Sequence, residues 1–285
     1  MDHAQALHNA IEKFENDHMR VFHESQTISV GFREIKRLCG ILTGTQIATI
    51  SVAPLESPEK TAFRTNQRTI CEIFGFTPDA AFEIKDKFLA FRKLVDSLLN
   101  VWDKDKITLT KTIVKTARDV INKRGKLVIL QGIPGSGKTT TAKLLKMALD
   151  ILQPETRVDY FEADIYMGNT FDKNRLSECH DSCKNATRSF LQNGGIAIVS
   201  NTNTLASEIK PYWLMAQEVI PNFTKDQVLL LEPPTLWRRN ANECRTKCTK
   251  KNIPHHTFTK YLENLTKNSS EEILKTFTEG SALKN

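Results

Sequence analysis

The sequence predicts an α/β fold in which a parallel sheet is covered by helices on both faces. Two observations predict it. After residue 125, short apolar runs alternate with amphipathic stretches, which is the rhythm of parallel strands joined by helices. Before residue 125, apolar residues recur mainly at helical spacing. We therefore expect a mainly helical N-terminal region over residues 1–125 and a sheet-containing domain over residues 126–285.

The N-terminal region contains three stretches that we expect to be helical, at residues 4–22, 77–102 and 108–125. Thr77 can cap the second helix and Pro78 suits its first turn, whereas Gly125 should end the third. Residues 44–60 favour a short strand followed by a loop. No motif assigns a function to this region, and we keep it as a candidate surface for a protein partner.

The second region alternates between the two kinds of element. We expect strands at 126–132, 157–164, 196–202 and 227–233, and helices at 139–152, 174–195, 206–220, 235–251 and 255–265. Ligands of parallel sheets bind outside the carboxyl ends of the strands. The polar motifs of this chain fall at those ends.

Composition and charge narrow the functional class. The chain has 285 residues, is 40% hydrophobic and carries a formal net charge of +7 with a pI near 9.0, which favours anionic partners such as nucleotides or nucleic acid. The N-terminus lacks the apolar core of a signal peptide and no apolar run reaches membrane-spanning length. We expect an intracellular, cytoplasmic protein that does not bind membranes, with the nucleus as an alternative location.

Six cysteines are expected to be reduced thiols in such a compartment. Two pairs, Cys179 with Cys183 and Cys244 with Cys248, have the i, i+4 spacing that could hold a metal on a helix. Neither pair has the CxxC spacing of common structural zinc sites, so we favour free thiols.

The stretch "GIPGSGKT" follows a predicted strand, opens a predicted helix and fits the phosphate-binding pattern G-x-x-x-x-G-K-[ST]. Its glycines let backbone N–H groups turn inward, and the helix dipole adds positive potential. Lys138 supplies a charge for the β/γ oxygens, and the Thr139 hydroxyl can bind Mg²⁺. We expect ATP or GTP to bind Gly132, Ile133, Pro134, Gly135, Ser136, Gly137, Lys138, Thr139 and Thr140.

Two further strand ends carry polar groups. Asp164 follows the second strand and could accept the proton of an attacking hydroxyl, although an N-cap or a ligand of a magnesium-bound water is the alternative role. Strand alternation would turn the neighbouring Glu162 to the other side of the sheet. The third strand ends in "SNTNT", residues 200–204, which offers uncharged hydrogen-bonding groups and also suits a turn.

A basic segment follows the fourth strand. Residues 235–251 should form a helical lid that neutralises charge on a transferred phosphoryl group, the alternative being a solvated basic helix. Its cations are Arg238, Arg239, Arg245, Lys247, Lys250 and Lys251.

Several motifs together resemble the 5′-hydroxyl polynucleotide kinase branch of the P-loop kinases. They are "GIPGSGKTT", "EADIYM…TFDKNRLSECHDSC", "IVSNTNT" and "LEPPTLWRRN" with "KKNIP", and they cover residues from about 126 to 265. The resemblance implies a P-loop kinase core with a helical lid, in which Lys138 and Thr139 bind ATP and Mg²⁺. It implies that Asp164 is the general base for the 5′-hydroxyl of RNA or DNA.

The resemblance also implies roles for residues around the acceptor and the lid. His180, Asn201, Asn203 and Arg238 would bind the acceptor, and Arg245 or Lys247 would contact ATP from the lid. The chain departs from the family pattern at Ala163 and Ser200, where many relatives have acids, and at Asn252, where glycine is usual.

Three functions follow as alternatives. The first is ATP-dependent phosphoryl transfer to a 5′-hydroxyl end of RNA or DNA. The second is transfer to a small hydroxyl acceptor such as a nucleoside, because the same architecture serves both. The third is a non-catalytic nucleotide- or RNA-binding module that recruits a partner through its N-terminal helices. The presence of Lys138, Thr139 and Asp164 together favours an enzyme.

Overall fold

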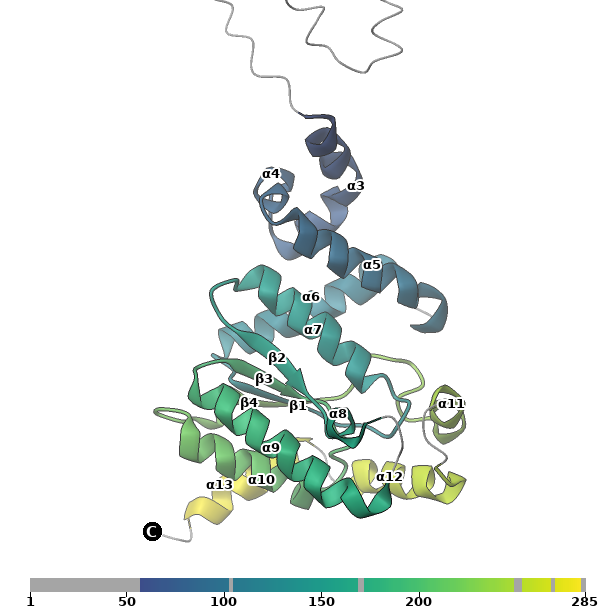
Figure 1. Cartoon of the computed structure of the whole chain (residues 1–285), viewed down its shortest axis with the longest axis vertical. Coiled ribbons are helices and arrows are strands. Elements are labelled where there is room, and N and C mark those ends of the chain that lie inside the picture. The colour runs from purple at the N-terminus through teal and green to yellow at the C-terminus, as the bar shows by residue number, and fades with distance from the viewer. Residues whose placement is uncertain (1–56, 103–104, 169–171, 249–252, 268–269, 283–285) are drawn as a thin grey trace, which may run out of the picture. The chain divides into compact units, whose positions relative to one another are not determined.

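The computed structural model describes residues 57–282 except 103–104, 169–171, 249–252 and 268–269 (Figure 1). Contacts divide the chain into two compact units, residues 1–65 and 66–285. The boundary expected near residue 125 does not coincide with this division. Helices that precede residue 125 contact the first helix after it, so residues 66–125 belong to the compact unit that contains the sheet. The expected helix at 4–22 and most of the expected strand and loop at 44–60 lie outside the described residues.

Within the described residues, four helices precede the sheet: α3 (Pro58–Phe74), α4 (Pro78–Phe82), α5 (Lys85–Trp102) and α6 (Lys106–Asn122). The Thr77 side chain accepts a hydrogen bond from the Ala80 N–H and Pro78 begins α4, as expected. The prediction of a single helix over 77–102 is wrong. The chain turns at residues 83–84, where the Ile84 N–H donates to the Ala81 carbonyl three residues back, and α5 begins after this turn. The sequence did not predict α3.

The end of α6 differs from its prediction. The helix ends at Asn122, and Arg124 rather than Gly125 has positive φ, at 52°. The Gly125 N–H donates to the Val120 carbonyl over 2.7 Å. A Cβ at Gly125 would lie 2.8 Å from a Leu229 side-chain carbon, so this glycine permits close packing of the chain on the sheet.

The sheet has four parallel strands in the order β2-β3-β1-β4. They are β1 (Leu127–Leu130), β2 (Val158–Phe161), β3 (Ile196–Val199) and β4 (Val228–Leu231). Strand β1 pairs with β3 and β4, and Ile129 lies opposite Val199 and Leu230. Strands β1 and β3 are buried along their whole length, which explains their continuous apolar sequence. The predicted parallel α/β fold is confirmed.

Helices cover both faces of this sheet (Figure 1). Helix α7 (Lys138–Leu152) packs with α5 and α6 on one side, and α9 (Leu176–Gln192), α10 (Ala206–Val219) and α13 (Ser270–Ala282) lie on the other. The second side holds a core around Trp213, whose ring centre lies 5.2 Å from that of Phe223 and 5.7 Å from that of Phe277. Helix α13 was not predicted.

The remaining helices are α8 (Asp164–Met167), α11 (Ala241–Lys247) and α12 (His255–Lys267), with 3-10 turns at Lys173–Arg175 and Lys225–Gln227. The helix expected over 235–251 is wrong for residues 235–240, which form turns and loop. Asn240 accounts for the late start, because its side-chain oxygen accepts from the N–H groups of Asn242 and Glu243. Lys250 and Lys251 lie outside the described residues. Across the residues described, none of the helices is long and apolar enough to cross a membrane.

Candidate functional site

The loop between β1 and α7, residues 131–137, is the centre of the candidate site. Gly135 and Gly137 have φ of 77° and 97°, which glycine adopts without steric cost. A Cβ at Gly135 would also overlap the Cys244 carbonyl oxygen. Glycine at this position therefore allows the loop both its conformation and its close contact with α11.

Lys138 lies at the start of α7 and folds back over the loop. Its side-chain nitrogen donates to the carbonyl oxygens of Gly132 and Ile133 over 2.8 and 2.9 Å, and the residue is only 9% exposed. Ser136, in the same loop, is fully buried, and its hydroxyl has no hydrogen-bond partner among the described residues. A buried hydroxyl of this kind is a group that a ligand could satisfy.

Thr139 in the first turn of α7 meets a carboxylate from the neighbouring strand end. Its hydroxyl donates to Glu162 Oε2 over 2.7 Å, and the Ser200 hydroxyl donates to the same oxygen over 2.9 Å. The expectation that Glu162 turns to the other side of the sheet is therefore wrong. Strand β2 ends at Phe161 and the backbone at Ala163 is already helical, so strand alternation does not extend to Glu162.

Asp164 is the first residue of α8 and its side chain is exposed. A buried side chain holds the turn that carries Asp164, because the Ala163 N–H donates to the Asn201 side-chain oxygen over 2.8 Å. Asp164 lies just beyond the carboxyl end of β2, as the sequence predicted.

Asn201 is buried and fully engaged within the protein. Its side-chain nitrogen donates to the Tyr212 hydroxyl oxygen over 3.0 Å and lies 3.5 Å from the Cys183 sulfur. Burial raises the pKa of the Cys183 thiol and of the Tyr212 hydroxyl, so both remain neutral at pH 7. These contacts favour a role for Asn201 in positioning the Asp164 turn over the predicted direct contact with an acceptor.

Asn203 is also buried and has positive φ, at 48°. Its side-chain nitrogen donates to the Leu130 carbonyl over 3.0 Å, and its own carbonyl accepts from the Gln131 side chain over 3.2 Å. The Gly132 N–H bonds the Thr202 carbonyl. The "NTNT" segment therefore fixes the start of the loop, a role that the sequence did not predict.

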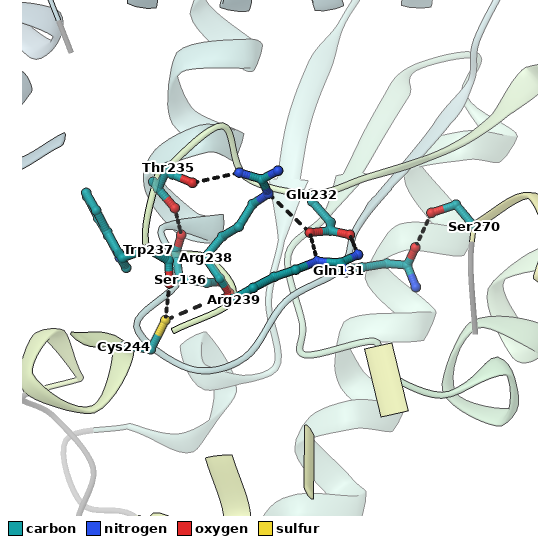
Figure 2. A network of polar contacts seen from close by, with 9 residues as sticks. All are labelled: Gln131, Ser136, Glu232, Thr235, Trp237, Arg238, Arg239, Cys244 and Ser270. Carbon is teal, nitrogen blue, oxygen red and sulfur yellow. Dashed lines mark hydrogen bonds and ion pairs between the residues drawn. The ribbon is translucent and has the colours of Figure 1, made fainter. Parts of the chain in front are cut away.

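The segment after β4 is bonded to the other side of the loop (Figure 2). The Thr235 hydroxyl donates to the Ser136 carbonyl over 2.8 Å, and the Trp237 indole N–H donates to the Gly135 carbonyl over 3.0 Å. The Cys244 thiol reaches the Trp237 carbonyl over 3.2 Å. These bonds hold residues 235–247 against the loop.

The predicted cations of this segment have different environments. Arg238 and Arg239 both bind the Glu232 carboxylate (Figure 2), over 3.3 and 2.6 Å. Burial acts to raise the pKa of Glu232, but the bonds and charges of Arg239 and Arg238 outweigh it and lower that pKa. Lys247 lies 4.1 Å from the centre of the Trp237 ring. Arg245 is exposed on α11.

His180 is exposed on α9, and the contacts described for it do not join it to the loop. In the part of the chain that the structure describes, five cysteines are free and there is no cluster of three His, Cys, Asp or Glu side chains that could hold a metal.

Comparison with known proteins shows a partial likeness. No family model matches the chain. A stretch of 120 residues, 41% of the chain, is 34% identical to NEDD4-binding protein 2 of Homo sapiens and covers 6% of the length of that protein. Because the matched stretch is so small a share of that relative, the likeness does not assign this chain to a family.

Proposed function

We propose that the chain transfers the γ-phosphoryl group of ATP to a hydroxyl, and that the acceptor is the 5′-hydroxyl end of RNA or DNA. The observation that carries the proposal is the segment at residues 132–139, which comprises most of the loop and the first two residues of α7. It joins a buried parallel strand to a helix and contains a buried lysine, a buried hydroxyl with no hydrogen-bond partner among the described residues and a hydroxyl bonded to a carboxylate.

The loop has the groups that a triphosphate needs. Backbone N–H groups at the start of α7 favour anions, and the Ser136 hydroxyl, which bonds none of the described residues, supplies a further donor. The Lys138 ammonium is already held inside the loop by two carbonyl oxygens. On binding, it would exchange those neutral acceptors for charged phosphate oxygens, which form stronger hydrogen bonds.

Mg²⁺ would be held at Thr139, whose hydroxyl lies beside the Glu162 carboxylate. The oxygen donors fit this ion, which prefers oxygen ligands and retains several waters. When bound, the ion neutralises charge on the phosphate oxygens.

The acceptor side is assigned to Asp164. Its carboxylate would take the proton of the attacking hydroxyl while the acceptor oxygen bonds the γ-phosphorus and the bond to the β–γ bridging oxygen breaks, releasing ADP. Asp164 is exposed at the end of β2, so a polynucleotide end can reach it. Asn201 holds the backbone of this turn through Ala163.

Charge on the transferred group would be neutralised from α11. Arg245 and Lys247 lie on this short helix, which contacts Gly135 through the Cys244 carbonyl. Arg238 is the weaker candidate for direct contact with the acceptor, because it is paired with Glu232. A preorganised cation at a developing charge is among the largest contributions to catalysis.

The test is transfer of labelled γ-phosphate from ATP and Mg²⁺ to 5′-hydroxyl RNA and DNA oligonucleotides. We expect transfer by the wild type, a fall of about 10²- to 10⁴-fold in Asp164→Asn with nucleotide affinity retained, and loss of nucleotide binding in Lys138→Ala. Glu155→Gln is the matched control, because Glu155 is exposed in the turn between α7 and β2. Nucleotide binding without transfer to either acceptor would contradict the proposal.

A further inference from the structure

We propose that Glu162 is the positioning carboxylate of the metal site, orienting the Thr139 hydroxyl toward Mg²⁺ and counterbalancing the charge of the ion. This inference rests on the proposed nucleotide site. It concerns a residue that the sequence pattern placed on the wrong side of the sheet. It gives this chain an acid for the metal site although Ala163, next to Glu162, and Ser200, after the adjacent strand, are uncharged.

The geometry brings three elements together at one oxygen atom. Thr139 comes from α7, Glu162 from the end of β2 and Ser200 from the end of β3, and both hydroxyls donate to Glu162 Oε2, over 2.7 and 2.9 Å. Ser200 is 4% exposed, so its bond holds the carboxylate from the protein interior.

The direction of the bonds decides what Thr139 can do. A hydroxyl has one proton and two acceptor lone pairs. Because the proton of Thr139 is donated to Glu162, the lone pairs remain for another partner, and beside a triphosphate a magnesium ion is a partner that uses them. Groups that orient a metal ligand in this way commonly change metal affinity by about 10- to 100-fold when they are removed.

The charge of Glu162 also supports a role at the metal site. A carboxylate beside Thr139 lies next to a loop suited to a triphosphate, and like charges repel at such separations. The repulsion becomes an attraction when a divalent cation lies between the two anions. Glu162 should therefore weaken the binding of metal-free ATP and strengthen the binding of the magnesium complex.

These opposite effects separate a metal role from a structural one. A residue that only braced α7 against β2 and β3 would change both affinities in the same direction on substitution. Glu162→Gln keeps the size of the side chain and an acceptor oxygen, and removes the charge.

The experiment measures the affinity of a non-hydrolysable ATP analogue with Mg²⁺ and with a chelator, by calorimetry, for the wild type and for Glu162→Gln. We expect the ratio of the affinity with Mg²⁺ to the affinity without it to fall by about 10- to 100-fold in the variant. The affinity for the metal-free analogue should be unchanged or tighter. Mn²⁺ in place of Mg²⁺, followed by electron paramagnetic resonance, should show the same loss of bound metal.

Two further variants sharpen the result. Asp159→Asn removes a charge from the same strand, where the carboxylate bonds the Tyr160 N–H, and should leave the ratio unchanged. Glu162→Gln combined with Ser200→Asp returns a carboxylate from the adjacent strand end and should restore part of the ratio.

A wild-type ratio in Glu162→Gln would overturn the inference while leaving the proposed function intact. Absence of nucleotide binding by the wild type, with and without Mg²⁺, would overturn both. Magnesium-dependent binding that needs Glu162, without transfer to any 5′-hydroxyl end, would support the inference and contradict the proposed acceptor.

Discussion

Individual residues in the candidate site divide into those that surround the proposed phosphate position and those that hold the backbone around it. Ser136 belongs to the loop, and Lys138 and Thr139 to the first turn of α7, whereas Asn201 and Asn203 are buried and bond backbone groups that carry the site. From the sequence we expected both asparagines to bind the acceptor. A polar residue after a strand gives the same local pattern whether it binds a ligand or holds a turn.

Substitution of Asn201 by alanine should destabilise the protein. It removes the acceptor of the buried Ala163 N–H and the donor to the Tyr212 hydroxyl oxygen, and an unsatisfied buried group costs about 1–3 kcal/mol. Urea unfolding measures the change. Asn193→Ala is the control, since Asn193 is exposed and bonds the Ser189 carbonyl at the end of α9. Equal stability of the two variants would contradict the positioning role.

We expect the free energy of unfolding to fall in alkaline solution because of two buried thiols. Burial raises the pKa of Cys71 and of Cys244 from the ordinary value of 9.0 to about 11. Above pH 9.0 the unfolded thiols ionise while the folded ones remain neutral, so the unfolded state binds fewer protons and stability decreases as pH rises toward about 11. Thermal unfolding of the wild type and of Cys71→Ala across this range should show a shallower decline in the variant. Parallel declines would contradict this account of Cys71.

Whole elements were predicted well where one local pattern decides them. The four strands are continuous apolar runs, and all four were found at the expected places. Glu162 and the segment at 235–240 were misjudged for a common reason. Tertiary bonds to Thr139, Ser200, Gly135 and Ser136 fix their conformation, and no local periodicity records those partners.

At the level of the element, the bonds from residues 235–247 to the loop should support nucleotide binding. Trp237→Phe keeps an aromatic ring, although a smaller one, and removes the N–H that bonds the Gly135 carbonyl. We expect weaker nucleotide affinity and faster amide hydrogen exchange in α11, because the loop and this segment stabilise each other. Trp213→Phe is the control for ring size, since Trp213 lies in the core on the α10 side and its indole nitrogen has no hydrogen-bond partner among the described residues. Unchanged exchange in α11 of Trp237→Phe would contradict this coupling.

At the scale of the whole molecule, the sequence predicted the α/β class and the strand ends at which the site lies. It placed a region boundary near residue 125, whereas the compact unit with the sheet begins at Asn66. Alternation of strands and helices marks where a sheet begins, but it does not show which earlier helices pack against it. Helices α5 and α6 belong to this unit through their contacts with α7.

We propose that the segment at residues 132–139 serves phosphoryl transfer to a polynucleotide end. The most direct measurement compares two oligonucleotides of one sequence, with a 5′-hydroxyl and with a blocked 5′ end, in transfer of labelled γ-phosphate by the wild type. We expect labelled product from the 5′-hydroxyl strand alone, with the label at its 5′ terminus. The Lys138→Ala variant should give no labelled product. Equal labelling of both strands, or of neither while ATP is bound, would contradict it.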